Sequence, residues 1–314
     1  MLMDRTATAP SPTVLPGIEH SASAEFIFAI FAVFGSAAGT GLALFYAARD
    51  GLPIFYFALL VSFLLLTAIG VTGGLHRLFT HRSYKSKRGL ALFLALAGTA
   101  AGQGFFLRWV YEHRLHHRRT DVPGDPHTPY FDGDRALGAA AGLLHSHLGW
   151  LFKPRPPIER DAILDLVSDP LWLLIDRWTV AITALGLLLP GLAGLAYAST
   201  WHGFVLGVLW GGLVRMFTMY HITWSVNSIC HFFGGRTSGQ THRATNHALI
   251  GWLALGEGWH SNHHEAPASA RHGGPGQIDL TYLFLLAMRR LGLVWDLRLP
   301  KPHASAAAPV HTLN

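Results

Sequence analysis

The sequence is poor in charged residues and in cysteine. Only 13% of its 314 residues are Asp, Glu, Lys or Arg, about half of the roughly 25% found in ordinary soluble domains. Half of the residues are apolar, and the two features together indicate a membrane protein. The single cysteine, Cys230, excludes an internal disulfide and any zinc site built from several thiolates. We expect it to be a small buried side chain.

The sequence also lacks internal repeats and a Gly-rich nucleotide-binding motif. Its formal net charge is +6, and a basic excess can serve nucleic-acid binding. Here the basic residues stand beside apolar segments, which suits the cytoplasmic face of a membrane better. We therefore expect contact with membrane lipid and no nucleic-acid partner.

Four apolar segments are long enough to cross a hydrocarbon core of about 30 Å, which takes about 20 helical residues. They are residues 24–47, 52–75, 172–197 and 203–220. Basic residues from Arg77 to Arg88 follow the second segment and place that side in the cytoplasm. Arg215 stands within the fourth segment, where a charge is expected to face the bundle interior.

Residues 89–107 are also apolar, but a crossing there would separate two histidine clusters. We expect this segment to lie near the membrane surface or to pack against other helices. The predicted fold is all-α: an integral membrane bundle of four transmembrane helices with a cytoplasmic helical cap that carries a histidine-rich dimetal site. Residues 24–300 form this domain, and residues 1–23 and 301–314 are expected to be disordered tails.

Histidines gather in three short clusters, each at the end of an apolar stretch. Residues three and four apart share a helix face, so each of the last two clusters can direct its imidazoles to one spot. The first pair is five residues apart, about 140° around a regular helix, and converges only if the helix end loosens or the site is broad. The clusters are His76 and His81; His113, His116 and His117; and His260, His263 and His264, with His231 standing alone.

Nine imidazoles are too many for one four-coordinate zinc, but they suit two metal ions of five or six coordination. Imidazole binds Fe, Zn, Cu and Ni alike, and zinc lacks redox chemistry. Neutral donors leave the full charge of both ions available to bind and activate O2, which favours iron. Carboxylates that fix the histidine tautomers are also expected, and the candidates are Glu112, Asp121, Asp125, Glu257 and Glu265.

These residues resemble the membrane fatty-acyl desaturases, most closely the acyl-CoA and acyl-lipid Δ9 group that includes stearoyl-CoA desaturases. The resemblance covers roughly residues 50–300. It rests on Gly74-Leu-His-Arg-Leu-Phe-Thr-His81, Glu112-His-Arg-Leu-His-His117 followed by Asp125-Pro-His127, Val226-Asn-Ser-Ile-Cys-His231, and Gly256-Glu-Gly-Trp-His-Ser-Asn-His-His264. The end of the domain, with Asp279-Leu-Thr-Tyr-Leu, resembles bacterial members.

The resemblance implies a di-iron centre that uses O2 and two electrons to remove two hydrogens from a long-chain acyl group at Δ9. It implies that the nine histidines are ligands and that Asn227 reaches one iron through a water. The substrate would be an acyl-CoA or an acyl-lipid. No cytochrome b5 domain is fused to the chain, so a separate ferredoxin, rubredoxin or cytochrome b5 with its reductase would supply electrons. The bacterial inner membrane, with the site on its cytoplasmic face, is the expected location.

By the same analogy, the acyl chain occupies a bent tunnel that runs from the metals between the spans. Trp109 and Trp224 are expected beside this channel, and Arg108 could meet an anionic head group or snorkel to lipid phosphates. Leu60 and Leu64 are expected to close the tunnel and set the chain length, although both could equally be packing or lipid-facing leucines.

Two other functions fit some of these features. A membrane di-iron hydroxylase of alkyl or lipid chains would keep the metal site and change the product. A metal transporter would place its ligands near the bilayer midplane, whereas these clusters follow the ends of the spans. His145 and His147 are expected to be interfacial or structural. His242 and His247 are not expected to bind metal, but they could help an electron donor to dock.

Overall fold

The computed structural model describes residues 20–236 and 242–300. Helices dominate this part of the chain. Four of them are long and apolar enough to cross a membrane: Ala22–Asp50, Ile54–Thr80, Thr179–Ala198 and Trp201–His231. The expected tails fall largely outside the described residues, although the first helix already begins at Ala22, where the Ser21 hydroxyl accepts a hydrogen bond from Ala24 N. The all-α membrane bundle is confirmed, apart from four strands of two residues each.

Three of the four spans change helix type along their length. The first consists of α1 (Ala22–Ile30), a π-helical turn (Phe31–Gly35) and α2 (Ser36–Asp50). The second consists of α3 (Ile54–Ile69) and a π-helical segment (Gly70–Thr80). The fourth consists of α10 (Trp201–Gly207), a π-helical segment (Val208–Val214), α11 (Arg215–Ser228) and a 3₁₀ turn (Ile229–His231).

The third span starts later than the sequence suggested. The segment from Trp172 to Arg177 belongs to α8 (Pro170–Arg177), and the span itself is α9 (Thr179–Ala198). The predicted start at residue 172 is therefore wrong. Asp169 caps α8, and Pro170 fits its first turn. Asp176 is buried at the end of this short helix and accepts a hydrogen bond from Leu107 N at 2.8 Å, so α8 supports the start of the helix that carries the second histidine cluster.

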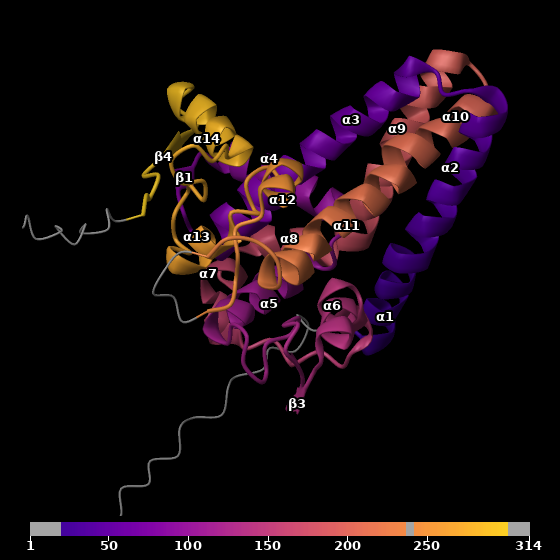
Figure 1. Cartoon of the computed structure of the whole chain (residues 1–314). Coiled ribbons are helices and arrows are strands. Elements are labelled where there is room, and N and C mark those ends of the chain that lie inside the picture. The colour runs from indigo at the N-terminus through magenta and orange to yellow at the C-terminus, as the bar shows by residue number, and fades with distance from the viewer. Residues whose placement is uncertain (1–19, 237–241, 301–314) are drawn as a thin grey trace, which may run out of the picture.

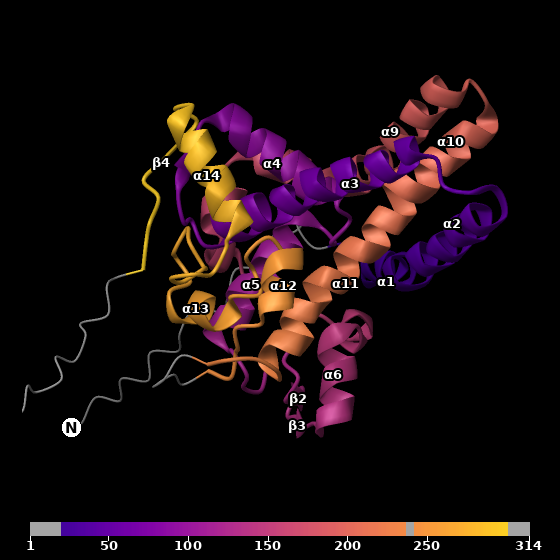
Figure 2. The same ribbon diagram turned by 45° about the horizontal axis from the view of Figure 1, so that its top comes forward.

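Shorter helices form the cap. Figure 1 shows α2, α3, α9 and α10 extending to one end of the molecule, while the short helices gather at the other end. In the turned view of Figure 2, α12 and α13 lie beside α5 and the end of α11. The cap helices are α4 (Arg88–Ala100), α5 (Phe106–Arg118), α6 (Ala139–His147), α7 (Leu164–Val167), α8, α12 (Ala248–Leu253), α13 (His260–Glu265) and α14 (Leu280–Arg290), with 3₁₀ turns at Gly149–Phe152 and Arg160–Ile163.

Two small antiparallel pairs tie loops of the cap together. Strand β1 (Lys85–Ser86) pairs with β4 (Val294–Trp295), with Lys85 opposite Trp295, so the segment after the second span meets the C-terminal part. Strand β2 (Phe131–Asp132) forms a hairpin with β3 (Arg135–Ala136). Neither pair lies within a span.

The apolar segment at residues 89–107 does not form a span. Its helix, α4, has 13 residues, too few to cross a membrane, and it packs against the π-helical segment that carries His76. The contact is backbone to backbone: a Cβ at Gly70 would lie 2.2 Å from Gly98 N. Only glycines allow this approach. The chain then turns and enters α5, so the first two histidine clusters remain on one side of the bundle.

Arg215 is fully buried inside the bundle and binds backbone carbonyls. Its Nη2 donates to Gly186 O at 3.0 Å and its Nη1 to Ala100 O at 3.0 Å. Gly186 O is free because Pro190, four residues later in α9, has no N–H to offer. A carbonyl without a partner is costly in a membrane. The guanidinium therefore supplies the donor that the proline removes, and it also fixes the end of α4.

We expect Arg215→Met to lower the free energy of unfolding in detergent by about 1–3 kcal/mol, because it strands the Gly186 carbonyl. Restoring a backbone donor with Pro190→Ala in the same chain should recover part of this loss. Thermal unfolding of the two single variants and the double variant measures the coupling. Strictly additive effects would contradict the assigned role of Arg215.

Candidate dimetal site

Nine histidine side chains meet at the boundary between the spans and the cap. They form two groups in which one potential ligand atom from each residue lies within 4.8 Å of all the others. Group A is His76, His81, His113, His117 and His263; group B is His116, His231, His260 and His264. The rings of His117 and His264 stack at 4.5 Å across the two groups. The structure thus brings together all nine histidines expected from the sequence, in two adjoining sets that could each hold one ion.

Local helix geometry explains how each cluster converges. His113, His116 and His117 lie at i, i+3 and i+4 on α5, and His260, His263 and His264 do the same on α13. The first pair is brought together by the π-helical segment, in which hydrogen bonds span five residues. His81 N accordingly donates to His76 O at 3.1 Å, and the two rings lie 4.7 Å apart.

His81 Nε2 has no ring nitrogen at hydrogen-bond distance, but six pairs of the other histidines within the groups face one another at that distance. Their Nε2 atoms are separated by 3.1 Å (His76–His263), 3.2 Å (His113–His117), 2.9 Å (His117–His263), 3.2 Å (His116–His264), 3.1 Å (His231–His260) and 3.0 Å (His260–His264). For a metal–imidazole bond of about 2.1 Å, nitrogens at 90° are about 3.0 Å apart, whereas tetrahedral nitrogens are about 3.4 Å apart. The spacing therefore fits five or six coordination better than a tetrahedral zinc site.

Carboxylates contact the opposite nitrogen of three of these histidines. Glu257 Oε2 lies 2.6 Å from His76 Nδ1, Asp125 lies 2.9 Å from His116 Nδ1, and Asp121 Oδ1 lies 3.0 Å from His231 Nδ1. A carboxylate at Nδ1 holds the proton there and leaves the Nε2 lone pair for a cation. Facing lone pairs at about 3 Å repel one another unless a cation lies between them, so the donor set fits bound metal.

The other two candidate carboxylates have different surroundings. Glu112 is buried and pairs with Arg155 at 2.8 Å, and Glu265 is exposed at the end of α13. Burial lowers the pKa of His113, His117 and His264 well below its ordinary value, and neighbouring imidazoles add to the effect. These rings are therefore neutral, which is the form that binds metal.

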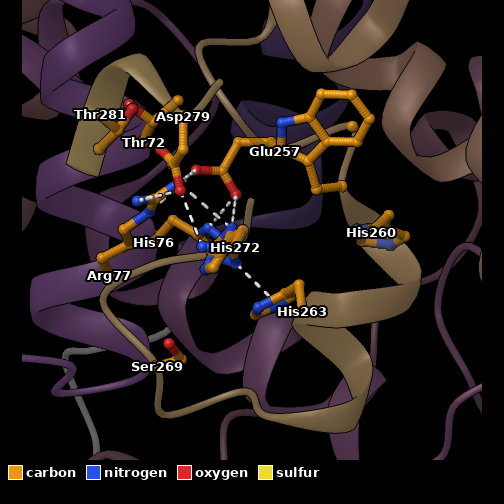
Figure 3. Close-up of polar contacts among 12 residues, drawn as sticks. Thr72, His76, Arg77, Glu257, His260, His263, Ser269, His272, Asp279 and Thr281 are labelled. Carbon is orange, nitrogen blue, oxygen red and sulfur yellow. Dashed lines mark hydrogen bonds and ion pairs between the residues drawn. The ribbon is translucent and has the colours of Figure 1, made fainter. Parts of the chain in front are cut away.

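Sequence reasoning missed a buried ion cluster behind group A (Figure 3). Arg77, next to His76, is fully buried and donates to Glu257 Oε1 at 3.0 Å, to Asp279 Oδ2 at 3.1 Å and to Ala270 O at 2.8 Å. His272 Nδ1 lies 3.1 Å from Glu257 Oε2. The contacts of Arg77 join residues about 180 to 200 positions apart, so no local pattern could reveal them. They hold Glu257 in position against His76.

A second missed residue is His127, which the sequence marked only as part of a motif. Its ring lies 4.4 Å from that of His116, and burial lowers its pKa to about 3. Together with Asp125 and His116 it forms a further compact set. It lines the cavity described next and packs against Trp150.

A largely apolar cavity of about 1230 Å³, part of it open to solvent, runs from the histidine groups between the spans. Trp109 and Trp224 line it, and so do Asn227, Arg108, His76 and His260. The cavity therefore reaches both histidine groups.

Leu60 and Leu64 are not among the lining residues. Leu60 packs in the cluster around Tyr56, and Leu64 packs against the main core. The wall contributed by the second span consists of Ala68, Val71, Thr72 and His76, one to four turns closer to the metal groups than the two leucines. Their role in chain length stays a prediction.

Removing the carboxylate that orients His76 should weaken metal binding. We expect Glu257→Gln to reduce metal affinity about 10–100-fold, measured by metal analysis of purified protein after titration with a chelator. Asp279→Asn is the matched control, because it removes a charge from Arg77 without touching His76. Equal metal loss in both variants would show that the cluster acts through folding alone.

Comparison with known proteins agrees with this geometry. A family model described as fatty acid desaturase matches residues 52–272. The chain is 38% identical over 245 residues to a hex-5-enoyl-[acyl-carrier protein] acetylenase of Moorena producens, covering 77% of this chain and 76% of that protein. It is 38% identical over 236 residues to an sn-1 stearoyl-lipid 9-desaturase of Anabaena variabilis, covering 74% and 79%.

A third relative, an acyl-CoA C20 Delta5-desaturase of Anemone leveillei, is 36% identical over 248 residues, covering 76% of this chain and 73% of that protein. The three relatives act on three different acyl carriers by their names, so likeness alone does not assign the carrier. The family itself is common to all of them. The chain belongs to the fatty acid desaturase family and is a membrane-bound fatty-acyl desaturase.

Proposed function

We propose that this enzyme introduces a double bond at Δ9 of a long-chain acyl group, with two iron ions and O2. The observation that carries the proposal is the pair of adjoining histidine groups at the end of a long apolar cavity. Two relatives named as stearoyl-lipid 9-desaturases support the position, at 38% and 35% identity. When bound, the irons would supply the redox chemistry that couples reduction of O2 to removal of two hydrogens.

The nine histidines would hold the irons, five in group A and four in group B, and Asn227 would hold a water at group B. Asn227 is not a member of either histidine group. It lines the cavity from α11 and lies one helical turn before His231. Group B has one nitrogen fewer than group A, so a water held by Asn227 would bring both ions to five coordination.

The protein's own contribution is to position the acyl chain and to exclude water. Val71, Ala68 and Met219 give the cavity an apolar wall, and Trp109 stacks against the ring of His113 at 5.3 Å. A chain held in this space presents one carbon pair to the histidine groups, so the position of the double bond follows from geometry. The metal groups lie where apolar wall and imidazoles meet, which shelters the reaction from bulk water.

The site is assigned to the cytoplasmic face of a bacterial inner membrane. Arg82, Lys85, Lys87 and Arg88 follow the second span on the side of the histidine groups, as expected for a cytoplasmic segment. Two electrons per turnover would come from a separate ferredoxin, rubredoxin or cytochrome b5 with its reductase.

Expression in a host that lacks its own desaturase tests the reaction. We expect acyl chains with a new Δ9 double bond, located by mass spectrometry of derivatised lipids. His263→Ala should abolish the product, because His263 belongs to group A and is completely buried, while the protein still inserts. His202→Ala, at the far end of the bundle in α10, is the matched control and should retain activity. Hydroxylated or triple-bonded chains without a Δ9 double bond would refute the proposed outcome.

Filling the cavity wall should shorten the preferred acyl chain. Ala68→Leu adds three carbons to a wall position that is 5% exposed, so it should shift the product distribution to shorter chains. Val61→Leu, on the exposed side of the same helix, should leave the distribution unchanged. If Leu60→Ala lengthens the product and Ala68→Leu has no effect, the end of the tunnel lies farther down α3 than the cavity indicates.

A further inference from the structure

Four charged side chains form a continuous series of ion pairs in the wall of the acyl cavity. Glu25 lies in the first turn of α1, Arg108 and Glu112 lie one turn apart on α5, and Arg155 follows the 3₁₀ turn at Gly149–Phe152. Arg108 Nε donates to Glu25 Oε1 at 2.9 Å, and Arg155 Nη1 lies 2.8 Å from Glu112 Oε2. Arg155 Nε also lies 3.8 Å from Glu25 Oε2. We refer to these four residues as the charged quartet.

The charged quartet has no net charge. Arg108 and Arg155 are the cations of the cavity wall, among the residues that the structure describes, and each is paired with a wall carboxylate. Arg108 also donates to Pro156 O, which uses a further N–H group. The side chains are 6% to 16% exposed, so the pairs are only weakly screened by solvent. The wall therefore offers an entering ligand no free cation.

The quartet lies at the start of the first span, where we expect the lipid head groups. Glu25 is in the first turn of the first span, Ala22–Asp50, on the side of the histidine groups. Helix α1 separates the cavity from the surroundings: Phe28 and Ala29 line the cavity, while Phe26 and Ile27 are 53% and 66% exposed on its other face. The charged quartet, which has no net charge, thus lies in the cavity wall at the start of the first span. Helix α1 forms the apolar wall between this part of the cavity and the lipid.

We infer that the charged quartet selects acyl groups esterified to a glycerolipid over acyl groups on coenzyme A. The inference rests on the proposed desaturase function. A glycerol ester carries no charge beside the acyl chain and can remain in the membrane interface. The diphosphate and phosphomonoester of coenzyme A would face Glu25 and Glu112, and would have to displace these carboxylates from both arginines to gain a cation. Specificity of this kind arises from repulsion of the wrong ligand as much as from attraction of the right one.

Competition between carriers tests the inference. Membranes containing the enzyme receive equimolar stearoyl-CoA, stearoyl-[acyl-carrier protein] and uncharged monogalactosyl-distearoylglycerol, each with a distinct isotope label, together with O2 and a reduced ferredoxin. Wild-type enzyme should desaturate the glycerolipid at least about tenfold faster than either thioester, a difference of about 1.4 kcal/mol. Faster turnover of stearoyl-CoA than of the glycerolipid by the wild type would overturn the inference.

Single substitutions then assign the selection to the quartet. Glu25→Gln frees Arg108 and leaves Arg155 one partner fewer, so the ratio of stearoyl-CoA to glycerolipid turnover should rise about fivefold or more. The rise should persist at high salt, because these side chains are 6% to 16% exposed and therefore only weakly screened. Glu159→Gln is the matched control, because Glu159 pairs with Arg118 away from the cavity wall and should leave the ratio unchanged. An unchanged ratio in Glu25→Gln contradicts the inference.

A binding measurement separates this inference from the reaction itself. Thermal unfolding in detergent is recorded with stearoyl-CoA or with monogalactosyl-distearoylglycerol and needs no turnover. Greater stabilisation of the wild type by the glycerolipid, with a gain for stearoyl-CoA in Glu25→Gln, supports the inference. Greater stabilisation of the wild type by stearoyl-CoA overturns it. Loss of all product from every carrier would refute the proposed function while these binding results still decide the carrier.

Discussion

The structure depends on bringing nine imidazoles from four segments to one boundary between membrane and cap. Facing ring nitrogens 2.9 to 3.2 Å apart repel one another as neutral lone pairs. Three features of the fold hold them there: the π-helical segment under His76 and His81, the two helices α5 and α13, and the carboxylates behind His76, His116 and His231. Bound cations would turn this repulsion into coordination.

The membrane-spanning helices also bring the histidines together. Two successive spans bring the chain back to the same side of the bilayer, and this happens twice along the chain. Residues more than 180 positions apart can therefore meet on that side. The polar side chain of Arg215 inside the bundle has a hydrogen-bond partner. Arg215 donates to the carbonyl that Pro190 leaves free, and it fixes the end of α4 beside the turn that leads into α5. A position deep in the bundle thereby supports the start of a cap helix.

Much of this organisation could be predicted from the sequence. The spacing of His113, His116 and His117 requires only a regular helix, and the apolar runs are long enough to count the spans. From the sequence, His76 and His81 are expected to converge only if the helix end loosens or the site is broad, because the sequence does not reveal a π-helical segment. The start of the third span was misplaced because Trp172 to Arg177 is apolar enough to extend it, and the short helix α8 became visible only through its contacts.

Residues that act across the chain escaped sequence reasoning. Arg77 meets Glu257 across 180 positions, and Glu25 meets Arg108 across 83 positions. No periodicity encodes such pairs. Leu60 and Leu64 pack in core clusters, and on the same span Ala68 and Val71 line the cavity, so the role of the two leucines in chain length stays a prediction. Side-chain direction on a uniformly apolar helix is set by its neighbours.

Metal analysis of the purified protein tests the central claim most directly. Quantification by mass spectrometry, together with X-ray absorption at the metal edge, should find two iron ions per chain with a shell of nitrogen ligands at five or six coordination. One ion per chain, or two ions in tetrahedral coordination, would contradict an account in which both histidine groups hold redox-active metal.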